Sequence, residues 1–183
     1  MRLTGFFALS GILLAALGLS GCFEDKETLA ERYAEWRQKN EKYILDQEAR
    51  VDAQGNAYFT RLTPSWAPDT YVLAHWHNDR RLTQNNLSPM DNSTVQVTYQ
   101  LLNVDGEEIS NSFSSADSVY TSRPSQNIIG MWVAMTSMNV GDSVTLVIPA
   151  SAGYGERTYG QIPPYSTLVY GVKLKAIKAY EVP

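Results

Sequence analysis

Alternating apolar and polar positions mark the second half of the chain. Over residues 94–101, four apolar side chains alternate with polar ones, which predicts a strand with one buried face. The alternation recurs over residues 168–175, and the largely apolar segment 144–148 stops at Pro149, so we expect two more strands. Residues 128–138 predict a short helix. Several strands, one short helix and no regular strand–helix alternation indicate an antiparallel α+β domain.

A second pattern occupies residues 24–50, which hold 14 charged residues in 27. A narrow apolar stripe runs through them at helical spacing, formed by Leu29, Tyr33, Trp36 and Tyr43. We interpret this segment as a spacer helix that packs its aromatic side chains on the domain, with Glu35 and Lys39 spaced for an i, i+4 ion pair. A dimer through helix 24–50 is the alternative, although Asn40 and Gln47 interrupt the stripe.

The start of the chain has the features of an export signal. Residues 6–19 form an apolar run that is short for a bilayer span and typical of a secretory signal. The following Leu19-Ser20-Gly21-Cys22 resembles the bacterial lipobox, whose cysteine is lipidated and becomes the new N-terminus. We therefore expect a lipoprotein signal peptide over 1–21 and acyl chains on Cys22 that tether the protein to a membrane. The alternatives are a secreted protein with a chance cysteine and an uncleaved anchor.

Composition narrows the classes of function. A single cysteine excludes an intramolecular disulfide framework and any multi-thiolate metal site. A net charge of −4 without a block of Lys or Arg argues against nucleic-acid binding. An acidic, exported protein is expected in the bacterial cell envelope. The outer membrane is favoured because Phe23, and not an aspartate, follows Cys22.

Residues 57–93 are the part that the pattern explains least. They contain turn formers around a short apolar piece, 71–74, and they either add a strand or border a binding pocket. His75 and His77 would share one face of a strand. Two histidines without a third ligand make a poor metal site, so we expect no metal and no cofactor.

Familiar catalytic motifs are absent from the sequence. It has no G-x-S-x-G, no H-E-x-x-H, no phosphate-binding glycine loop and no reactive thiol. Instead, nine of the eleven tyrosines lie from Tyr58 onward. Such aromatic side chains either complete a core or line a concave apolar pocket with their hydroxyls pointing inward.

The order of short motifs then resembles the FKBP-type peptidyl-prolyl cis-trans isomerases. The resemblance covers residues 92–178 and implies an antiparallel sheet curled around one short helix, within an FKBP-like domain over 57–183 that follows a tether and charged helix over 22–56. The motifs are Val97-Thr98-Tyr99, Asp105-Gly106, Ile128-Ile129-Gly130, Met138-Asn139-Val140-Gly141, Ile148-Pro149, Gly153-Tyr154-Gly155 and Ile162-Pro163-Pro164 through to Tyr170.

The resemblance also implies a site. Tyr99 matches the pocket tyrosine of an early strand, Ile128 the residue whose backbone N–H meets a substrate carbonyl, and Tyr154 the tyrosine whose hydroxyl bonds a ligand carbonyl. The remaining implied pocket residues are Ile109, Ser110, Tyr120, Met131, Tyr159, Ile162 and Tyr170.

Three of these positions depart from the family pattern. Ile109 and Ser110 stand where the family usually has Phe-Asp, and Met131 takes the place of the tryptophan at the pocket floor. The loss of the carboxylate is the largest change, because a serine is a weaker acceptor.

We therefore expect a membrane-tethered prolyl isomerase that acts on proline-containing exported polypeptides. It would withdraw water from the prolyl amide and twist it in an apolar aromatic pocket. A non-catalytic binding module or chaperone for envelope proteins is the alternative that Ile109 and Ser110 favour. A purely structural envelope lipoprotein is the third.

Overall fold

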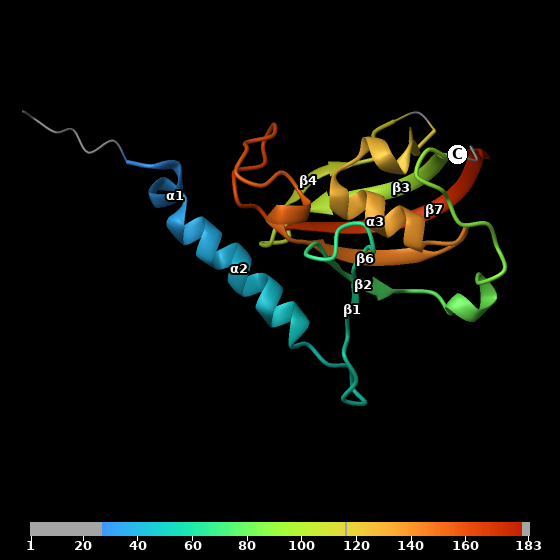
Figure 1. The fold of residues 1–183 in the computed structure, drawn as a ribbon, viewed down its shortest axis with the longest axis horizontal. Helices are drawn as coiled ribbons and strands as arrows, with labels where there is room; N and C mark the ends of the chain where they lie inside the picture. Colours follow the sequence, from blue (N-terminus) through green and yellow to red (C-terminus); the bar gives the residue numbers. More distant parts are fainter. Residues whose placement is uncertain (1–26, 116, 181–183) are drawn as a thin grey trace, which may run out of the picture.

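A single curved sheet forms the body of the protein (Figure 1). The computed structural model describes residues 27–115 and 117–180. Seven strands of this part pair in the order β1-β2-β6-β7-β3-β4, with β5 also paired to β3. The helices are α1 (Leu29–Arg32), α2 (Ala34–Glu48) and α3 (Ile129–Ser137), and the strands are β1 (Thr60–Leu62), β2 (Val72–Trp76), β3 (Thr94–Leu102), β4 (Glu108–Asn111), β5 (Tyr120–Ser122), β6 (Ser143–Ile148) and β7 (Leu168–Ala179), with 3-10 turns η1 (Arg80–Leu82), η2 (Pro124–Gln126) and η3 (Ala150–Ala152).

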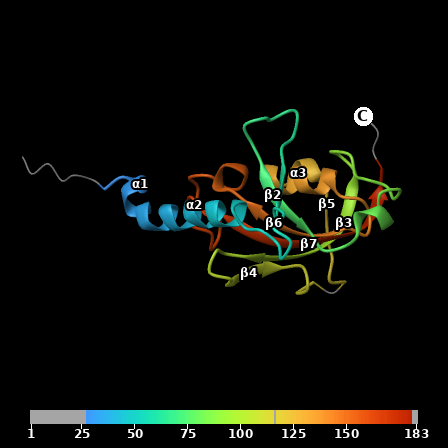
Figure 2. The same ribbon diagram turned by 90° about the horizontal axis from the view of Figure 1, so that it is seen from below.

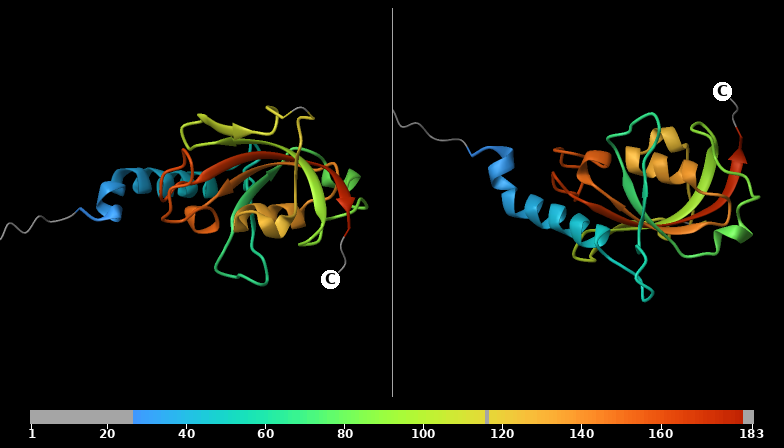
Figure 3. Two further views of the ribbon diagram at one scale, coloured as in Figure 1. Left: turned by 90° about the horizontal axis from the view of Figure 1, so that it is seen from above. Right: turned by 60° about the horizontal axis from the view of Figure 1, so that its bottom comes forward.

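The predicted antiparallel α+β architecture is confirmed. Every pairing between neighbouring strands is antiparallel, and β3 runs beside β7 along its whole length. The sheet curls around α3, as Figure 3 shows. The inward-facing residues of β3, β6 and β7 pack with the buried face of α3 to form the main hydrophobic core.

Helix α3 lies close to the sheet because one position carries no side chain. A Cβ on Gly130 would stand 2.4 Å from Cγ2 of Ile148, which lies at the end of β6. Glycine at this position therefore allows a close approach of helix and sheet that any other residue would obstruct.

Residues 57–93 add strands to the sheet, which settles one of the open alternatives. β2 lies between β1 and β6, and its residues Val72, Leu73 and Ala74 are buried. Directly after them, the rings of His75 and His77 stand 5.1 Å apart, as expected for two side chains on one face. His75 Nδ1 lies 2.8 Å from the carbonyl oxygen of Tyr58, and His77 Nε2 lies 2.8 Å from Thr145 Oγ1.

Helix α2 extends beside the segment that leads into β7 (Figure 2). The expectation that its aromatic residues pack on the domain is confirmed for Trp36, whose indole N–H donates to Ser166 Oγ at 3.1 Å. Asn40, which interrupts the apolar stripe, is nevertheless buried and accepts the backbone N–H of Thr167. An amide that is fully hydrogen-bonded can lie in an interface as well as an apolar side chain does.

Lys39 forms its ion pair with Asp105, a residue far away in the sequence, and not with Glu35 as expected. Lys39 Nζ lies 2.5 Å from Asp105 Oδ1, in the turn between β3 and β4. The docking of α2 brings this carboxylate within reach, which sequence spacing on the helix does not reveal.

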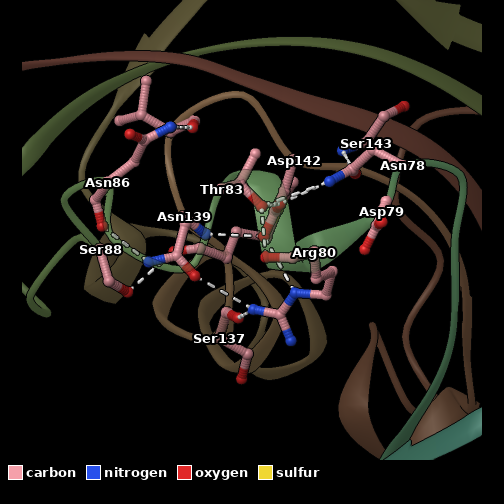
Figure 4. A network of polar contacts seen from close by, with 12 residues as sticks. Asn78, Asp79, Arg80, Thr83, Asn86, Ser88, Ser137, Asn139, Asp142 and Ser143 are labelled. Carbon is pink, nitrogen blue, oxygen red and sulfur yellow. Dashed lines mark hydrogen bonds and ion pairs between the residues drawn. The ribbon is translucent and has the colours of Figure 1, made fainter.

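A buried carboxylate joins the long segment after β2 to the turn that follows α3 (Figure 4). Asp142 has no exposed side-chain surface. It accepts hydrogen bonds from Asn78 Nδ2, Thr83 Oγ1, Arg80 Nε and the backbone N–H of Asn139, at 2.9, 2.5, 3.2 and 2.8 Å. We call these five residues the Asp142 network.

The described part of the chain gives limited information on membrane attachment. Among the described residues, no helix is long and apolar enough to cross a bilayer. The expected signal peptide and Cys22 lie outside the described residues.

Candidate active site

The sheet, α3 and the loop before β7 enclose one large pocket of about 940 Å³. This volume is within the range of pockets that hold small ligands or short peptide segments. All ten pocket residues implied by the sequence line it, from six different strands, helices or loops: Tyr99, Ile109, Ser110, Tyr120, Ile128, Met131, Tyr154, Tyr159, Ile162 and Tyr170.

The pocket has a buried apolar floor and an exposed aromatic rim. Met131, Ile162 and Tyr170 are only 4, 3 and 8% exposed. Tyr120 and Tyr159 are 41 and 59% exposed. A bound segment would therefore lose water at its inner end and keep it at the outer end.

Tyr99 connects three sides of the pocket. Its hydroxyl lies 3.1 Å from Ser110 Oγ on the neighbouring strand β4. Its ring packs edge-on against Tyr120, with centroids 5.6 Å apart, and lies 5.9 Å from the ring of Tyr170. Ser110 thus orients the phenol by a neutral hydrogen bond where a carboxylate would have given a charged one.

Tyr154 enters the pocket after η3 and stacks on Tyr159, with ring centroids 4.2 Å apart and planes within 8°. Burial is the main cause that raises the pKa of Tyr154 to about 12, and the nearby phenols of Tyr159, Tyr120 and Tyr99 add to it. Burial likewise raises the pKa of Tyr170. At neutral pH both hydroxyls are therefore protonated, and each can donate a hydrogen bond.

Ile128 caps the N-terminal end of α3. The amides at the start of a helix have no acceptor within the helix, so they are suited to a carbonyl from outside. The side chain of Ile128 packs against the core, which fixes the backbone at this point.

The lining also includes residues that the sequence did not single out. Arg157 is the charged one, and it is exposed in the loop that carries Tyr159. The remaining ones are Leu101, Gln126, Asn127, Ile129, Gly153, Thr158, Gly160 and Gln161. Leu101 and Ile129 belong to β3 and α3, and the others are loop or turn residues, which no signal in the sequence assigned to a pocket.

No cluster for a metal ion forms at the pocket or elsewhere in the described ranges: three His, Cys, Asp or Glu side chains gather nowhere in them. What the pocket offers chemically is apolar surface, neutral hydroxyl donors, amide side chains, the backbone amide at the start of α3 and, at the exposed edge, the guanidinium of Arg157. These groups can bind and orient an amide, and the described lining holds no His, Asp, Glu or Lys side chain that could act as a base to activate the hydroxyl of Ser110 or Thr158.

Comparison with known proteins agrees with this geometry. A family described as FKBP-type peptidyl-prolyl cis-trans isomerase matches residues 86–175. Over 88 residues the chain is 38% identical to FK506-binding protein 1 of Gibberella zeae, a match that covers 46% of this chain and 79% of that protein. The chain belongs to this isomerase family.

The chain is also similar to bacterial FKBP-type proteins. FkpA of Escherichia coli K12 is 34% identical over 91 residues, which cover 50% of this chain and 33% of FkpA. The match thus spans a third of that relative's length.

Two solved structures share the fold. The crystal structure of E. coli FkpA has a TM-score of 0.63 at 25% identity and covers 82% of this chain and 64% of that one. A peptidyl-prolyl cis-trans isomerase of Pseudomonas syringae has a TM-score of 0.63 at 20% identity, covering 79 and 95%. The FKBP-like fold expected from the motifs is therefore confirmed.

Proposed function

We propose that this FKBP-type chain catalyses the cis–trans isomerisation of X–Pro bonds. The observation that carries the proposal is the pocket, in which the neutral hydroxyl of Tyr154 and the backbone of Ile128 stand at an apolar floor. Membership of the isomerase family supports the same activity.

The reaction explains why such a pocket suffices. Resonance gives the peptide C–N bond partial double-bond character and a barrier of about 18–20 kcal/mol to rotation. Water stabilises the charge separation of the planar amide, and an apolar pocket removes that stabilisation. The ground state then resists twisting less, and the reaction needs no general acid, general base or metal.

The groups at the pocket have separate parts in this scheme. Met131 and Ile162 exclude water from the proline ring, while Tyr154 and the Ile128 amide hold the carbonyl as the bond turns. A thousandfold acceleration corresponds to about 4 kcal/mol, at about 1.4 kcal/mol for each factor of ten. Shape and one or two hydrogen bonds are sufficient for an effect of that size.

The test is the exchange rate of an X–Pro peptide, measured by exchange NMR with the full chain and with Tyr154→Phe. We expect catalysis by the wild type and a roughly tenfold lower kcat/KM for the variant, because one hydroxyl donor is lost. The matched control is Tyr43→Phe, which removes a phenol hydroxyl from α2. An equal rate for wild type and Tyr154→Phe would remove this residue from the mechanism.

A non-catalytic binding module is the second candidate, and Ser110 favours it. None of the described lining residues is a carboxylate, and Ser110 bonds the phenol of Tyr99 in its place. Ser110→Asp separates the two functions when rate and peptide affinity are measured independently. The isomerase proposal expects measurable turnover in the wild type, whereas a binding module gains turnover only in Ser110→Asp.

The site of action that we propose is the bacterial envelope, on proline-containing exported polypeptides. The lipobox-like residues 19–22 support a lipid tether, preferably at the outer membrane. Labelling with radioactive palmitate in a bacterial host tests the tether: we expect label in the wild type and none in Cys22→Ser. An unlabelled wild type would contradict it.

A further inference from the structure

The loop that carries the pocket residues Tyr154, Tyr159 and Ile162 is tied to a helix that lies outside the pocket. Asn40, in the middle of α2, is 1% exposed on a helix that is otherwise largely open to solvent. Its Oδ1 accepts the backbone N–H of Thr167 at 2.7 Å, and its carbonyl accepts the Thr167 hydroxyl at 3.3 Å. The Asn40 amide in turn donates to the carbonyl of Trp36 at 2.7 Å, which fixes its orientation.

A second bond reaches the same loop one turn earlier on the helix. Trp36 Nε1 donates to Ser166 Oγ at 3.1 Å, and this hydroxyl donates to the carbonyl of Pro163 at 2.7 Å. Pro163 follows the pocket residue Ile162 directly in the chain. Trp36 is therefore two hydrogen bonds and one peptide unit away from the pocket floor.

Between Pro163 and Ser166, the loop folds back on the segment that holds Tyr154. The backbone N–H of Tyr165 donates to the carbonyl of Gly155 at 2.7 Å, and Gly155 is the neighbour of Tyr154. Tyr165 has a φ of 61°, a left-handed conformation that is unfavourable for a residue with a side chain. The guanidinium of Arg37 lies 5.2 Å from the Tyr165 ring centroid, so α2 also contacts this strained residue.

We propose that Asn40 and Trp36 are positioning residues for the prolyl site. α2 holds residues 163–167, and these in turn fix where Tyr154 and Ile162 stand. The inference rests on the proposed isomerase function, to which it adds a contribution from a helix outside the FKBP-type match at 86–175. Neither residue lines the pocket itself.

The size of the effect follows from the sensitivity of catalysis to geometry. A displacement of about 1 Å at a reacting group can cost about a hundredfold in rate. Loss of the Asn40 bonds would loosen the loop without removing any group that touches substrate. We therefore expect a three- to tenfold lower kcat, with KM changed less than twofold.

The decisive comparison pairs Asn40→Leu with Asn78→Leu in the full chain. Both changes remove an amide from a polar network between segments far apart in sequence, but no residue of the Asp142 network lines the pocket. Asn78→Leu should lose stability and keep the wild-type kcat. Equal kcat values for the two variants would overturn the proposal, because α2 would then contribute stability alone.

If Asn40→Leu does not fold, Trp36→Phe is the second variant to test. It removes the N–H that bonds Ser166 and shortens the ring, but it keeps an aromatic side chain at this position, and we expect a smaller fall in kcat in the same direction. A folded Trp36→Phe with an unchanged kcat and unchanged loop amides would then count against the proposal.

A second readout is independent of catalysis. Backbone NMR shifts of Tyr154 and Ile162 should move in Asn40→Leu and stay unchanged in Asn78→Leu. If the wild type shows no isomerase activity, the proposed function fails and these shifts alone decide the coupling. If the wild type is active but the shifts and kcat of Asn40→Leu stay at wild-type values, the coupling fails and the function stands.

Discussion

Replacing Asp142 by Asn tests how much stability one buried carboxylate contributes. The carboxylate accepts four hydrogen bonds, from Asn78, Thr83, Arg80 and the amide of Asn139. An amide of the same shape keeps one acceptor oxygen and turns a donor toward the others, so about two bonds are lost. Hydrogen bonds to a charged group contribute about 1.5–3 kcal/mol each. Because Arg80 is 40% exposed and water can replace its partner, we expect a total loss of about 3 kcal/mol.

The same carboxylate gives this loss a defined pH dependence. Burial alone would raise the pKa of Asp142, but the bonds from Asn139, Thr83 and Asn78 and the charge of Arg80 hold the pKa below its ordinary value. A carboxyl whose pKa is lowered on folding stabilises the protein above its unfolded pKa of about 3.9. That contribution is lost as the pH falls through the lower, folded value.

Urea denaturation followed by tryptophan fluorescence measures both effects. At pH 7 the free energy of unfolding of Asp142→Asn should lie about 3 kcal/mol below the wild type, and the gap should narrow as the pH falls below about 4. Lys42→Ala, on the exposed face of α2, controls for the loss of one member of an ion pair. A gap under 0.5 kcal/mol, or one that does not change with pH, would refute the reasoning.

Three further predictions address the packing, the surface and the site. Gly130→Ala should destabilise the fold by about 1–3 kcal/mol in thermal unfolding, because the new Cβ meets Ile148; an unchanged melting temperature would contradict the close approach of α3. Lys39→Ala should cost less than about 1 kcal/mol in urea, since its pair with Asp105 is exposed, and a larger loss would show that this contact contributes more than a surface ion pair does. The kcat/KM should stay level from pH 6 to 9, because the pKa of Tyr154 is about 12; a rate that follows a neutral titration would point to another group.

The local pattern of apolar and polar residues was sufficient to predict the central strands of the sheet. Alternation over 94–101 and, less strictly, over 168–175 predicted β3 and β7, and the largely apolar run 144–148 predicted β6. β3 and β7 have one face on the main core, so burial imposes a period of two on their sequence. β6 is buried on both faces at its end, where Val147 packs with Ile44, Phe59 and Leu73, so its sequence is largely apolar without alternation. β4 was not predicted, because it is a strand of only four residues, Glu-Ile-Ser-Asn, that are mostly polar. It lies at the edge of the sheet, where one side of the strand is not paired.

The pocket, in contrast to the central strands, could not be predicted from local sequence pattern. Its ten residues come from six separate segments, and nothing local joins Tyr99 to Tyr154 or Tyr170. Only the order of the family motifs brought them together in advance. The roles assigned to them stay predictions until they are measured.

Asn40 illustrates what the sequence does not disclose. In a helical pattern a polar residue indicates the solvent face, and here its partner is Thr167, more than a hundred positions away. Long-range satisfaction of a buried amide leaves no periodic signal. The same holds for Asp142, whose donors are spread from residue 78 to 139.

The most direct test of the account is the isomerisation rate of an X–Pro peptide with the full chain, measured by exchange NMR together with the circular dichroism of the same sample. The account predicts a rate above the uncatalysed one that rises in proportion to protein concentration and falls in Tyr154→Phe. A folded protein that leaves the peptide at its uncatalysed rate, at every concentration, would contradict it.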